Sequence, residues 1–265
     1  MDIPFDVVKI IASYTVKHKT KLVDWIPLNN LYATNLSLNP NAIDLFQGKY
    51  YSIKWSYYCL NINAVHMLEL DENYDKIDWG LLSQNPNAVH ILEKNIKKID
   101  WQSISRNPNA IHLLERYPKK IYWSFLSENP NAIHILEANP DKINWFGLAK
   151  NPNAIHILEA NPDKINWDWL SENPNAIKLL EANLDKINWD RLALNPNAIH
   201  ILEANPDKIN WFSLSENPNA IHLLKANQHK IIWGLISKNP NIFEPDTKQY
   251  NIDLSNKTNL LDQYI

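Results

Sequence analysis

Residues 145–166 read WFGLAKNPNAIHILEANPDKIN, and this 22-residue unit recurs along most of the chain. Its tryptophan marks the period most clearly, because a tryptophan recurs every 22 residues from Trp79 to Trp233. Trp55 precedes Trp79 by 24 residues, and Ala33 takes the tryptophan position in a still earlier copy. A fixed period of this length is typical of a repeat architecture. We therefore expect about ten copies over residues 33–242 and number them from copy 1, at Ala33, to copy 10, at Trp233.

The segment 151–160 of this unit predicts a helix. Asn151 suits the N-cap, and Pro152 suits the first helical position, where its missing N–H costs nothing. The apolar residues of the segment share one face of a helix. In a strand, by contrast, the neighbours Ile157 and Leu158 would point to opposite sides. Asn161 suits a left-handed residue at the helix end, and the proline that follows it forbids continuation.

A second, shorter helix is predicted to start at Trp167, with Asn166 as its cap and Leu170 one turn later. Helices this short are unstable alone in water, so stacking of successive copies must hold them. We predict an all-α fold, an α-solenoid of about ten two-helix repeats. With helices ~8–10 Å apart it would form a rod or arc on the order of 90 Å long.

A leucine-rich-like β/α solenoid is the alternative fold, because leucine-rich repeats share this period. Such repeats need a Leu-x-Leu strand before the asparagine, whereas this unit has Leu148-Ala149-Lys150 there. The predicted organisation is an N-terminal cap segment over 1–32, the repeat solenoid over 33–242, and a C-terminal cap or tail over 243–265.

Charge and cysteine content narrow the class of protein. A formal net charge of −3 offers no general attraction to nucleic acid or to an anionic membrane. The single cysteine, Cys59, excludes an internal disulfide framework and favours a reducing compartment. No apolar run approaches the ~20 residues of a membrane span, and residues 1–6 lack the basic region of a signal peptide. The one basic cluster along the sequence, Lys17-His18-Lys19-Thr20-Lys21, is interpreted as a solvated loop, so we predict an intracellular protein with neither a nucleic-acid nor a membrane partner.

The consensus NPNAIHILEANPDKINWxxLSxNPNAI resembles the short tandem repeats of uncharacterised proteins from giant DNA viruses of the mimivirus kind. The segments 21–27 and 239–244 are similar to the ends of those arrays. The resemblance implies a viral protein made in an infected cell, in the host cytoplasm or the virion. It implies no activity and no cofactor.

Residues 1–20 are an addition to that pattern. The segment 3–14 resembles the first helix of an F-box, which recruits ubiquitin-ligase machinery. The match is one helix long, however, and every solenoid needs a cap over its first repeat. We therefore favour an amphipathic cap, with a ligase adaptor as the alternative.

Three polar rows recur with the period and were considered as sites of chemistry. The histidine row is read as a solvated face, because Lys178 and Asp44 replace it in two copies and members ~8–10 Å apart cannot share one zinc ion. The serine row lacks an adjacent base and accepts Cys or Ala, which indicates a small packing site. The glutamate row, at Glu159 and its equivalents, is read as solvated. We predict no enzyme, no metal site and no cofactor. The histidines are His66, His90, His112, His134, His156, His200 and His222.

The second asparagine of the Asn-Pro-Asn motif, Asn153 in the reference copy, recurs in all ten copies. A helix cap explains the first asparagine but not the second one. We expect its amide to bond the neighbouring copy in an asparagine ladder, with a ligand-binding row of amides as the alternative.

Positions that vary among copies mark free surface or a recognition face. The most variable ones follow the tryptophan, and several are aromatic, which a purely solvated position rarely favours. We predict partner binding there, with padding of the core as the alternative. The predicted partner-binding residues are Phe125, Phe146, Trp169, Arg191, Phe212, His134, His156 and His200. The predicted function is a non-enzymatic scaffold for a protein partner in the infected cell, with a self-associating virion component as the second hypothesis.

Overall fold

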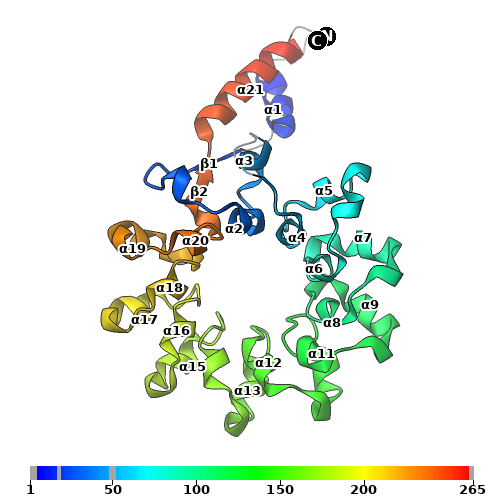
Figure 1. Cartoon of the computed structure of the whole chain (residues 1–265), viewed down its shortest axis with the longest axis vertical. Helices are drawn as coiled ribbons and strands as arrows, with labels where there is room; N and C mark the ends of the chain where they lie inside the picture. Colours follow the sequence, from blue (N-terminus) through cyan, green and yellow to red (C-terminus); the bar gives the residue numbers. More distant parts are fainter. Residues whose placement is uncertain (1–4, 17–18, 48–51, 263–265) are drawn as a thin grey trace.

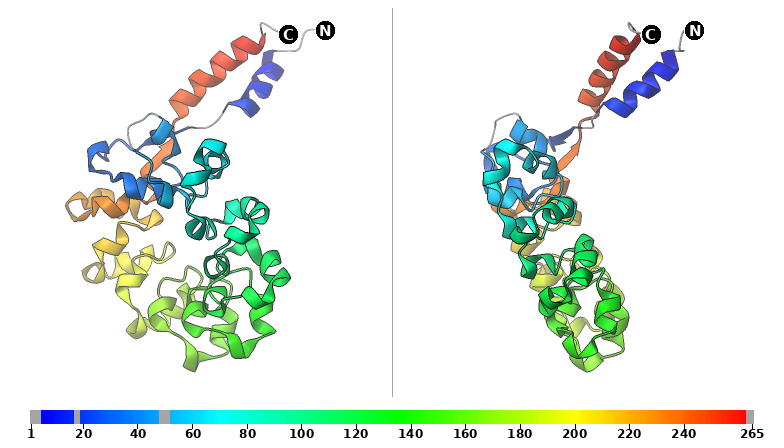
Figure 2. Two further views of the ribbon diagram at one scale, coloured as in Figure 1. Left: turned by 45° about the vertical axis from the view of Figure 1, so that its right-hand side comes forward. Right: turned by 90° about the vertical axis from the view of Figure 1, so that its right-hand side faces the viewer.

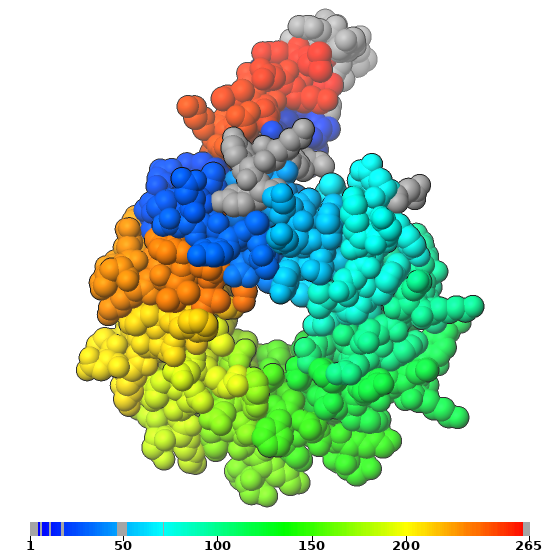
Figure 3. Space-filling model, in the orientation of Figure 1, coloured from blue at the N-terminus to red at the C-terminus, as the bar shows by residue number. Residues whose placement is uncertain are grey.

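A computed structural model of the protein describes residues 5–16, 19–47 and 52–262. Over these residues the chain is mostly helical, and its short helices follow one another around a ring with a central opening (Figure 1; Figure 3). Two longer helices, α1 (Phe5–Thr15) and α21 (Thr247–Asp262), project from the ring side by side (Figure 2). The predicted helical repeat is thus observed, but it closes into a ring instead of forming an open rod or arc.

The short helices form two concentric sets (Figure 1). The set nearer the opening starts at the tryptophan position of each copy. It comprises α2 (Ala33–Leu38), α4 (Trp55–Tyr58), α6 (Trp79–Leu82), α8 (Trp101–Ile104), α10 (Trp123–Leu126), α12 (Trp145–Lys150), α14 (Trp167–Leu170), α16 (Trp189–Leu192), α18 (Trp211–Leu214) and α20 (Trp233–Ile236). The outer set comprises α3 (Ile43–Gln47), α5 (Val65–Leu68), α7 (Val89–Lys94), α9 (Ile111–Arg116), α11 (Ile133–Glu137), α13 (Ile155–Glu159), α15 (Ile177–Glu181), α17 (Ile199–Ala204) and α19 (Ile221–Ala226).

The helix predicted from Pro152 starts later than expected. α13 covers only Ile155–Glu159, and the Asn-Pro-Asn-Ala segment before it is a turn. In four copies this turn is a 3-10 helix. Its first asparagine still acts as a cap, because the Asn151 side-chain oxygen accepts from the Asn153 N–H at 3.0 Å. The four 3-10 helices are η3 (Pro86–Ala88), η5 (Pro108–Ala110), η11 (Pro218–Ala220) and η13 (Pro240–Ile242).

The end of the outer helix also differs from the prediction. Asn161 has φ −133° and ψ 61°, so it is not left-handed. Its amide donates to the Ile157 carbonyl at 2.9 Å and thereby satisfies one of the carbonyls that a helix end leaves free. A short 3-10 turn, η8 (Pro162–Lys164), then leads to the next inner helix, where Asn166 accepts from the Trp169 N–H at 3.0 Å as the predicted cap.

The core lies between the two sets of helices. Ala154, Leu158 and Leu170 are fully buried, and their equivalents are buried in the other copies. The tryptophans that start the inner helices are only half-buried. In six copies a lysine at the end of the same copy lies over the ring, as the Lys164 ammonium does 4.6 Å from the centre of the Trp145 ring.

Both asparagines of the motif link each copy to the preceding one. The side-chain amide of Asn151 donates to the carbonyls of Ser127 (3.1 Å) and Asn129 (2.7 Å), and Asn151 is fully buried. The Asn153 amide donates to the Pro130 carbonyl at 2.9 Å. This confirms the predicted ladder for the second asparagine. It adds a deeper ladder of first asparagines, which we had interpreted only as caps.

The same bonds close the ring. Asn39 of copy 1 donates to the carbonyls of Ser237 (3.0 Å) and Asn239 (2.8 Å) in copy 10. Asn41 donates to the Pro240 carbonyl at 3.0 Å. Copy 1 therefore bonds copy 10 in the way that the other copies bond the one before them. Both asparagine ladders continue across the joint between the two ends of the array. We call this joint the seam.

Two short strands reinforce the seam. β1 (Thr20–Leu22) pairs antiparallel with β2 (Phe243–Pro245), with Lys21 opposite Glu244. Thr20 also reaches copy 1, because its hydroxyl donates to the Asn41 carbonyl at 2.7 Å. These are the only strands among the described residues, and neither belongs to the 22-residue unit, so the alternative β/α fold is not found.

Candidate functional site

The serine row holds structural hydroxyls. The Ser127 hydroxyl donates to the Trp123 carbonyl at 2.8 Å and accepts from the Asn144 N–H at 3.0 Å. Ser127 is fully buried. The row is therefore a hydrogen-bonded link between the inner helix and the residue that caps the next inner helix, which is more than the packing site that we predicted. A hydroxyl engaged in this way is not poised as a nucleophile.

Cys59 takes the serine position in copy 2 and is equally enclosed. It is fully buried, and its sulfur accepts from the Asp78 N–H at 3.4 Å. Burial raises the pKa of the Cys59 thiol, and burial likewise raises the pKa of the adjacent Tyr58 to about 12. Both groups therefore stay neutral at ordinary pH, and the thiol has little reactive thiolate.

The histidine row lies on the outer helices and pairs with the glutamate row of the preceding copy. The Nε2 atoms of His134, His156 and His200 lie 3.0, 3.1 and 2.9 Å from a glutamate Oε1. These histidines are exposed, as predicted, but they are not isolated. Six such pairs run around the outside of the ring. They are His90–Glu69, His112–Glu93, His134–Glu115, His156–Glu137, His200–Glu181 and His222–Glu203. Over the part of the chain that the structure describes, no cluster of three or more metal-ligating side chains is found.

The aromatic residues predicted to form one binding row occupy two different positions. Phe146 and Phe212 directly follow a tryptophan and are 61% and 60% exposed. Phe125 and Trp169 lie one residue further along and are half-buried. On a helix, adjacent positions are about 100° apart, so the two pairs do not share a face.

Cationic side chains cover the half-buried aromatics. The Trp169 ring has the Lys150 ammonium 3.5 Å from its centre and the Arg191 guanidinium carbon at 3.2 Å. Arg191 also bonds Glu172 at 3.1 Å. The structure therefore brings Trp169 and Arg191 together, in contacts between successive copies. Phe146 and Phe212 remain the open members of the predicted set.

The arm, which we define as α1 and α21, shows a larger apolar surface. Between its two helices the fully or nearly fully buried residues are Val8, Ala12 and Thr258. Apolar residues on the rest of the arm are strongly exposed. Their exposed fractions are 51% for Phe5, 41% for Val7, 55% for Ile10, 86% for Tyr14, 45% for Ile252 and 46% for Leu260.

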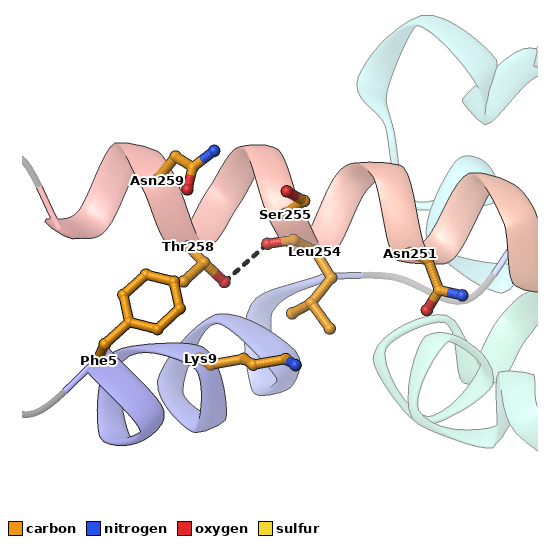
Figure 4. Close-up of a pocket in the computed structure, with 7 residues that line it drawn as sticks. All are labelled: Phe5, Lys9, Asn251, Leu254, Ser255, Thr258 and Asn259. Carbon is orange, nitrogen blue, oxygen red and sulfur yellow. Dashed lines mark hydrogen bonds between the residues drawn. The ribbon is translucent and has the colours of Figure 1, made fainter.

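A shallow groove runs along the joint of the two helices (Figure 4). Across it, Phe5 of α1 points toward Thr258, and Leu254 of α21 points toward Lys9, whose side chain runs along α1. The Thr258 hydroxyl donates to the Leu254 carbonyl at 2.8 Å and so is occupied within its own helix. The groove is lined by Phe5, Lys9, Asn251, Leu254, Ser255, Thr258 and Asn259.

The arm differs from the cap that we predicted for the N-terminal segment. α1 packs on α21 and points away from the ring, so it does not cover the first copy as a cap would (Figure 2). Ile3 and Pro4 of the F-box-like segment lie outside the described residues, as do Lys17 and His18 of the basic cluster. The partner helix was missed because residues 243–265 carry no repeat signal.

Comparison with known proteins finds no matching protein family, no matching curated protein and no matching solved structure. Within residues 5–16, 19–47 and 52–262, no helix combines the length and the apolar character needed to cross a membrane.

Proposed function

We propose that the protein is a non-enzymatic scaffold, a closed α-solenoid of ten repeats that carries a two-helix arm for binding a protein partner. The observation that supports this most strongly is the apolar surface of the arm, where Ile10 is 55% and Tyr14 is 86% exposed. An amphipathic helix is stable when its apolar stripe is covered, and two helices alone leave much of theirs in water. Exposed apolar patches of this kind mark protein-interaction sites.

The polar side chains of the ring support the same proposal. Its recurrent polar residues are engaged in holding the repeats together: the asparagines and the outer His–Glu pairs bond the neighbouring copy, and the serine hydroxyls bond within their own copy. Side chains used for architecture are not available for chemistry. The ring is then a rigid support, and the surfaces left for function are the arm and the exposed positions of the repeat. The resemblance to giant-virus repeats places this role, as a proposal, in an infected cell.

The test is affinity capture from infected cells with quantitative mass spectrometry, using the full chain and two matched variants. The first variant is Ile10→Ser with Tyr14→Ser on the arm, and the second is Phe146→Ser with Phe212→Ser on the ring. All four side chains are exposed, so we expect unchanged circular dichroism and melting temperature. A partner that is lost with the arm variant, retained with the ring variant, and bound by the purified protein would support the proposal. A partner lost only with the ring variant would indicate that the binding site lies on the inner helices. This result would contradict the proposal.

Two alternatives share these exposed residues. A self-associating virion component would bury the arm against a second copy, and light scattering across concentrations would then show a dimer that the arm variant dissolves. A ligase adaptor would use α1 alone, which is favoured by the exposure of Phe5, Val7 and Ile10 on that helix. It predicts that the captured partner is a ligase subunit.

A further inference from the structure

Two adjacent copies of the ring carry a dense group of positive charges on their outer side. Copy 3 contributes Lys94, Lys97 and Lys98, and copy 4 contributes Arg116, Lys119 and Lys120. All six side chains are exposed, and within the described part of the chain none of them forms an ion pair with a carboxylate. We call these six residues the basic sector.

The fold places the two groups of three side by side. Lys94 ends α7, and Lys97 and Lys98 lie in η4 (Ile96–Lys98) around one shallow hollow. Arg116 ends α9, and η6 (Pro118–Lys120) holds the equivalent lysines. The two outer helices are neighbours (Figure 1), because His112 of α9 lies 2.8 Å from Glu93 of α7.

The basic sector departs from the repeat in a way that frees its last lysines, although Arg116 lies 5.6 Å from the centre of the Tyr117 ring. In six other copies the last lysine lies on a tryptophan ring, as Lys164 does on Trp145 at 4.6 Å. No such contact is found for Lys98 or Lys120, both of which are described. Tyrosines pack edge-on against their tryptophans instead, with ring centres 5.5 Å apart for Tyr74–Trp79 and 5.2 Å apart for Trp101–Tyr117.

The neighbouring copies limit what can bind. At the position of Lys97 and Lys119, the following four copies carry aspartate, and on the other side copy 2 carries Glu72 and Asp75. The four aspartates are Asp141, Asp163, Asp185 and Asp207. With copies ~8–10 Å apart, the basic sector is about 20 Å wide. A long polyanion such as a nucleic acid would extend from it onto carboxylates in both directions and be repelled. A short anionic segment would not.

From this placement we infer that the basic sector docks a short acidic segment of a protein partner. An extended segment of about six residues spans 20 Å, because each residue adds ~3.3 Å. Its carboxylates would meet flexible, hydrated ammonium groups, so the contact provides steering and selectivity through charge. The sector lies on the ring, away from the arm, and the inference stands independently of partner binding by the arm.

The probe for this inference is a fluorescein-labelled hexapeptide of alternating Asp and Glu, titrated with the full-length protein at low salt. The test variant is Lys97→Asp with Lys119→Asp, which installs the residue that the other copies carry and so preserves the fold. The control variant is Lys178→Asp with Lys225→Asp, which makes the same change in net charge at exposed positions elsewhere on the ring. We expect the test variant to weaken peptide binding at least ~10-fold and the control to change it by less than ~2-fold. Binding should also weaken as salt rises through 0.15 M, where the Debye length is about 8 Å.

Several outcomes would overturn the inference. Equal weakening by both variants would mean that the peptide senses only the net charge. A 20-nucleotide single strand that binds more tightly than the peptide at the same ionic strength would make nucleic acid the ligand. A salt-sensitive dimer that the test variant dissolves would make the acidic side of a second ring the occupant. The arm variant Ile10→Ser with Tyr14→Ser should bind the peptide normally, so a failure of the arm proposal remains distinguishable.

Discussion

The seam between copies 10 and 1 and the joint between copies 5 and 6 are built from the same contacts across very different sequence distances. At the ordinary joint, Asn151 donates to carbonyls 24 and 22 residues earlier, at 3.1 and 2.7 Å. At the seam, Asn39 donates to carbonyls 198 and 200 residues later, at 3.0 and 2.8 Å. The curvature built into each copy is therefore enough to bring the last copy onto the first, where the asparagine bonds of an ordinary joint are formed again.

The two joints differ in what holds the copies together besides these bonds. An ordinary joint has a covalent chain running through it, whereas the seam joins the two ends of the array. There the β1–β2 pair supplies a substitute, with Lys21 and Glu244 3.0 Å apart and Thr20 bonded to copy 1. Beyond the two strands the chain continues into α1 and α21, so the two helices of the arm extend the contact between the two ends of the array.

Removal of a first asparagine should have the largest effect, and the effect should be equal at both joints. Asn151→Ala and Asn39→Ala each delete a cap and two amide donations in a fully buried site. Each change removes one donor from two carbonyls of the neighbouring copy and one acceptor from a backbone N–H, so we expect each to lower the free energy of unfolding by about 3 kcal/mol. Urea denaturation followed by circular dichroism measures this.

The matched control for that pair is Asn153→Ala, which deletes one donation at an exposed position and should cost about 1 kcal/mol. The comparison between the two joints decides the architecture. If Asn39→Ala left stability unchanged while Asn151→Ala lowered it, the ring would be open in solution.

A circular permutant tests closure more directly. The permutant joins Ile265 to Met1 by a flexible linker and is opened between Pro140 and Asp141. An ordinary joint then lacks its covalent connection and has no strand pair to replace it. We expect a folded monomer that is about 1–2 kcal/mol less stable, because the short covalent connection at one joint is replaced by a longer one through the arm and the linker. Small-angle scattering should give the same radius of gyration as the parent chain. An extended profile would show that the ring needs its natural chain order.

Much of this architecture follows from the sequence, because each copy meets the same environment. The period, the two helices, the Asn166 cap and the ladder of second asparagines were all predictable from local chemistry. The buried ladder of first asparagines was not predictable. Its asparagines were already explained as helix caps through their side-chain oxygens, so nothing in the sequence pointed to the bonds of their amide N–H groups. Closure was not predictable either, since it depends on the small rotation between copies, which packing sets and the period does not encode.

The candidate sites divide in the same way. The aromatic positions after the tryptophan were recognised as variable, but one residue of offset separates exposed Phe146 from half-buried Trp169, and only packing reveals this. The basic sector could have been found by alignment of the copies, because Lys97 and Lys119 occupy one register 22 residues apart. A search along the chain for consecutive charges finds residues 17–21 instead. The arm brings together two ends that no repeat signal connects.

The serine row offers a stabilising change. Ala193 and Ala149 replace serine in two copies, and the Asn210 N–H therefore lacks the hydroxyl acceptor that Ser127 gives Asn144. Ala193→Ser should restore that bond and raise the free energy of unfolding by about 0.5–1 kcal/mol. Ser127→Ala is the reverse change and should lower it by a similar amount. Thermal melting of both variants, measured side by side, checks the sign, and a loss of stability with Ala193→Ser would contradict the role given to the hydroxyl.

We expect the smallest effect on stability on the outside of the ring, where the His–Glu pairs are regular in geometry but contribute little because they are exposed. Lys178 interrupts the His–Glu row, leaving Glu159 without the histidine that faces Glu137 one copy earlier. Lys178→His would complete the row, but an exposed pair gains little from its charges, so stability should change by no more than about 0.5 kcal/mol at pH 7. Melting curves at pH 6 and pH 8 would show whether even that gain depends on protonation of the imidazole. A gain of several kcal/mol would mean that the outer row, and not only the buried asparagine ladder, holds the copies together.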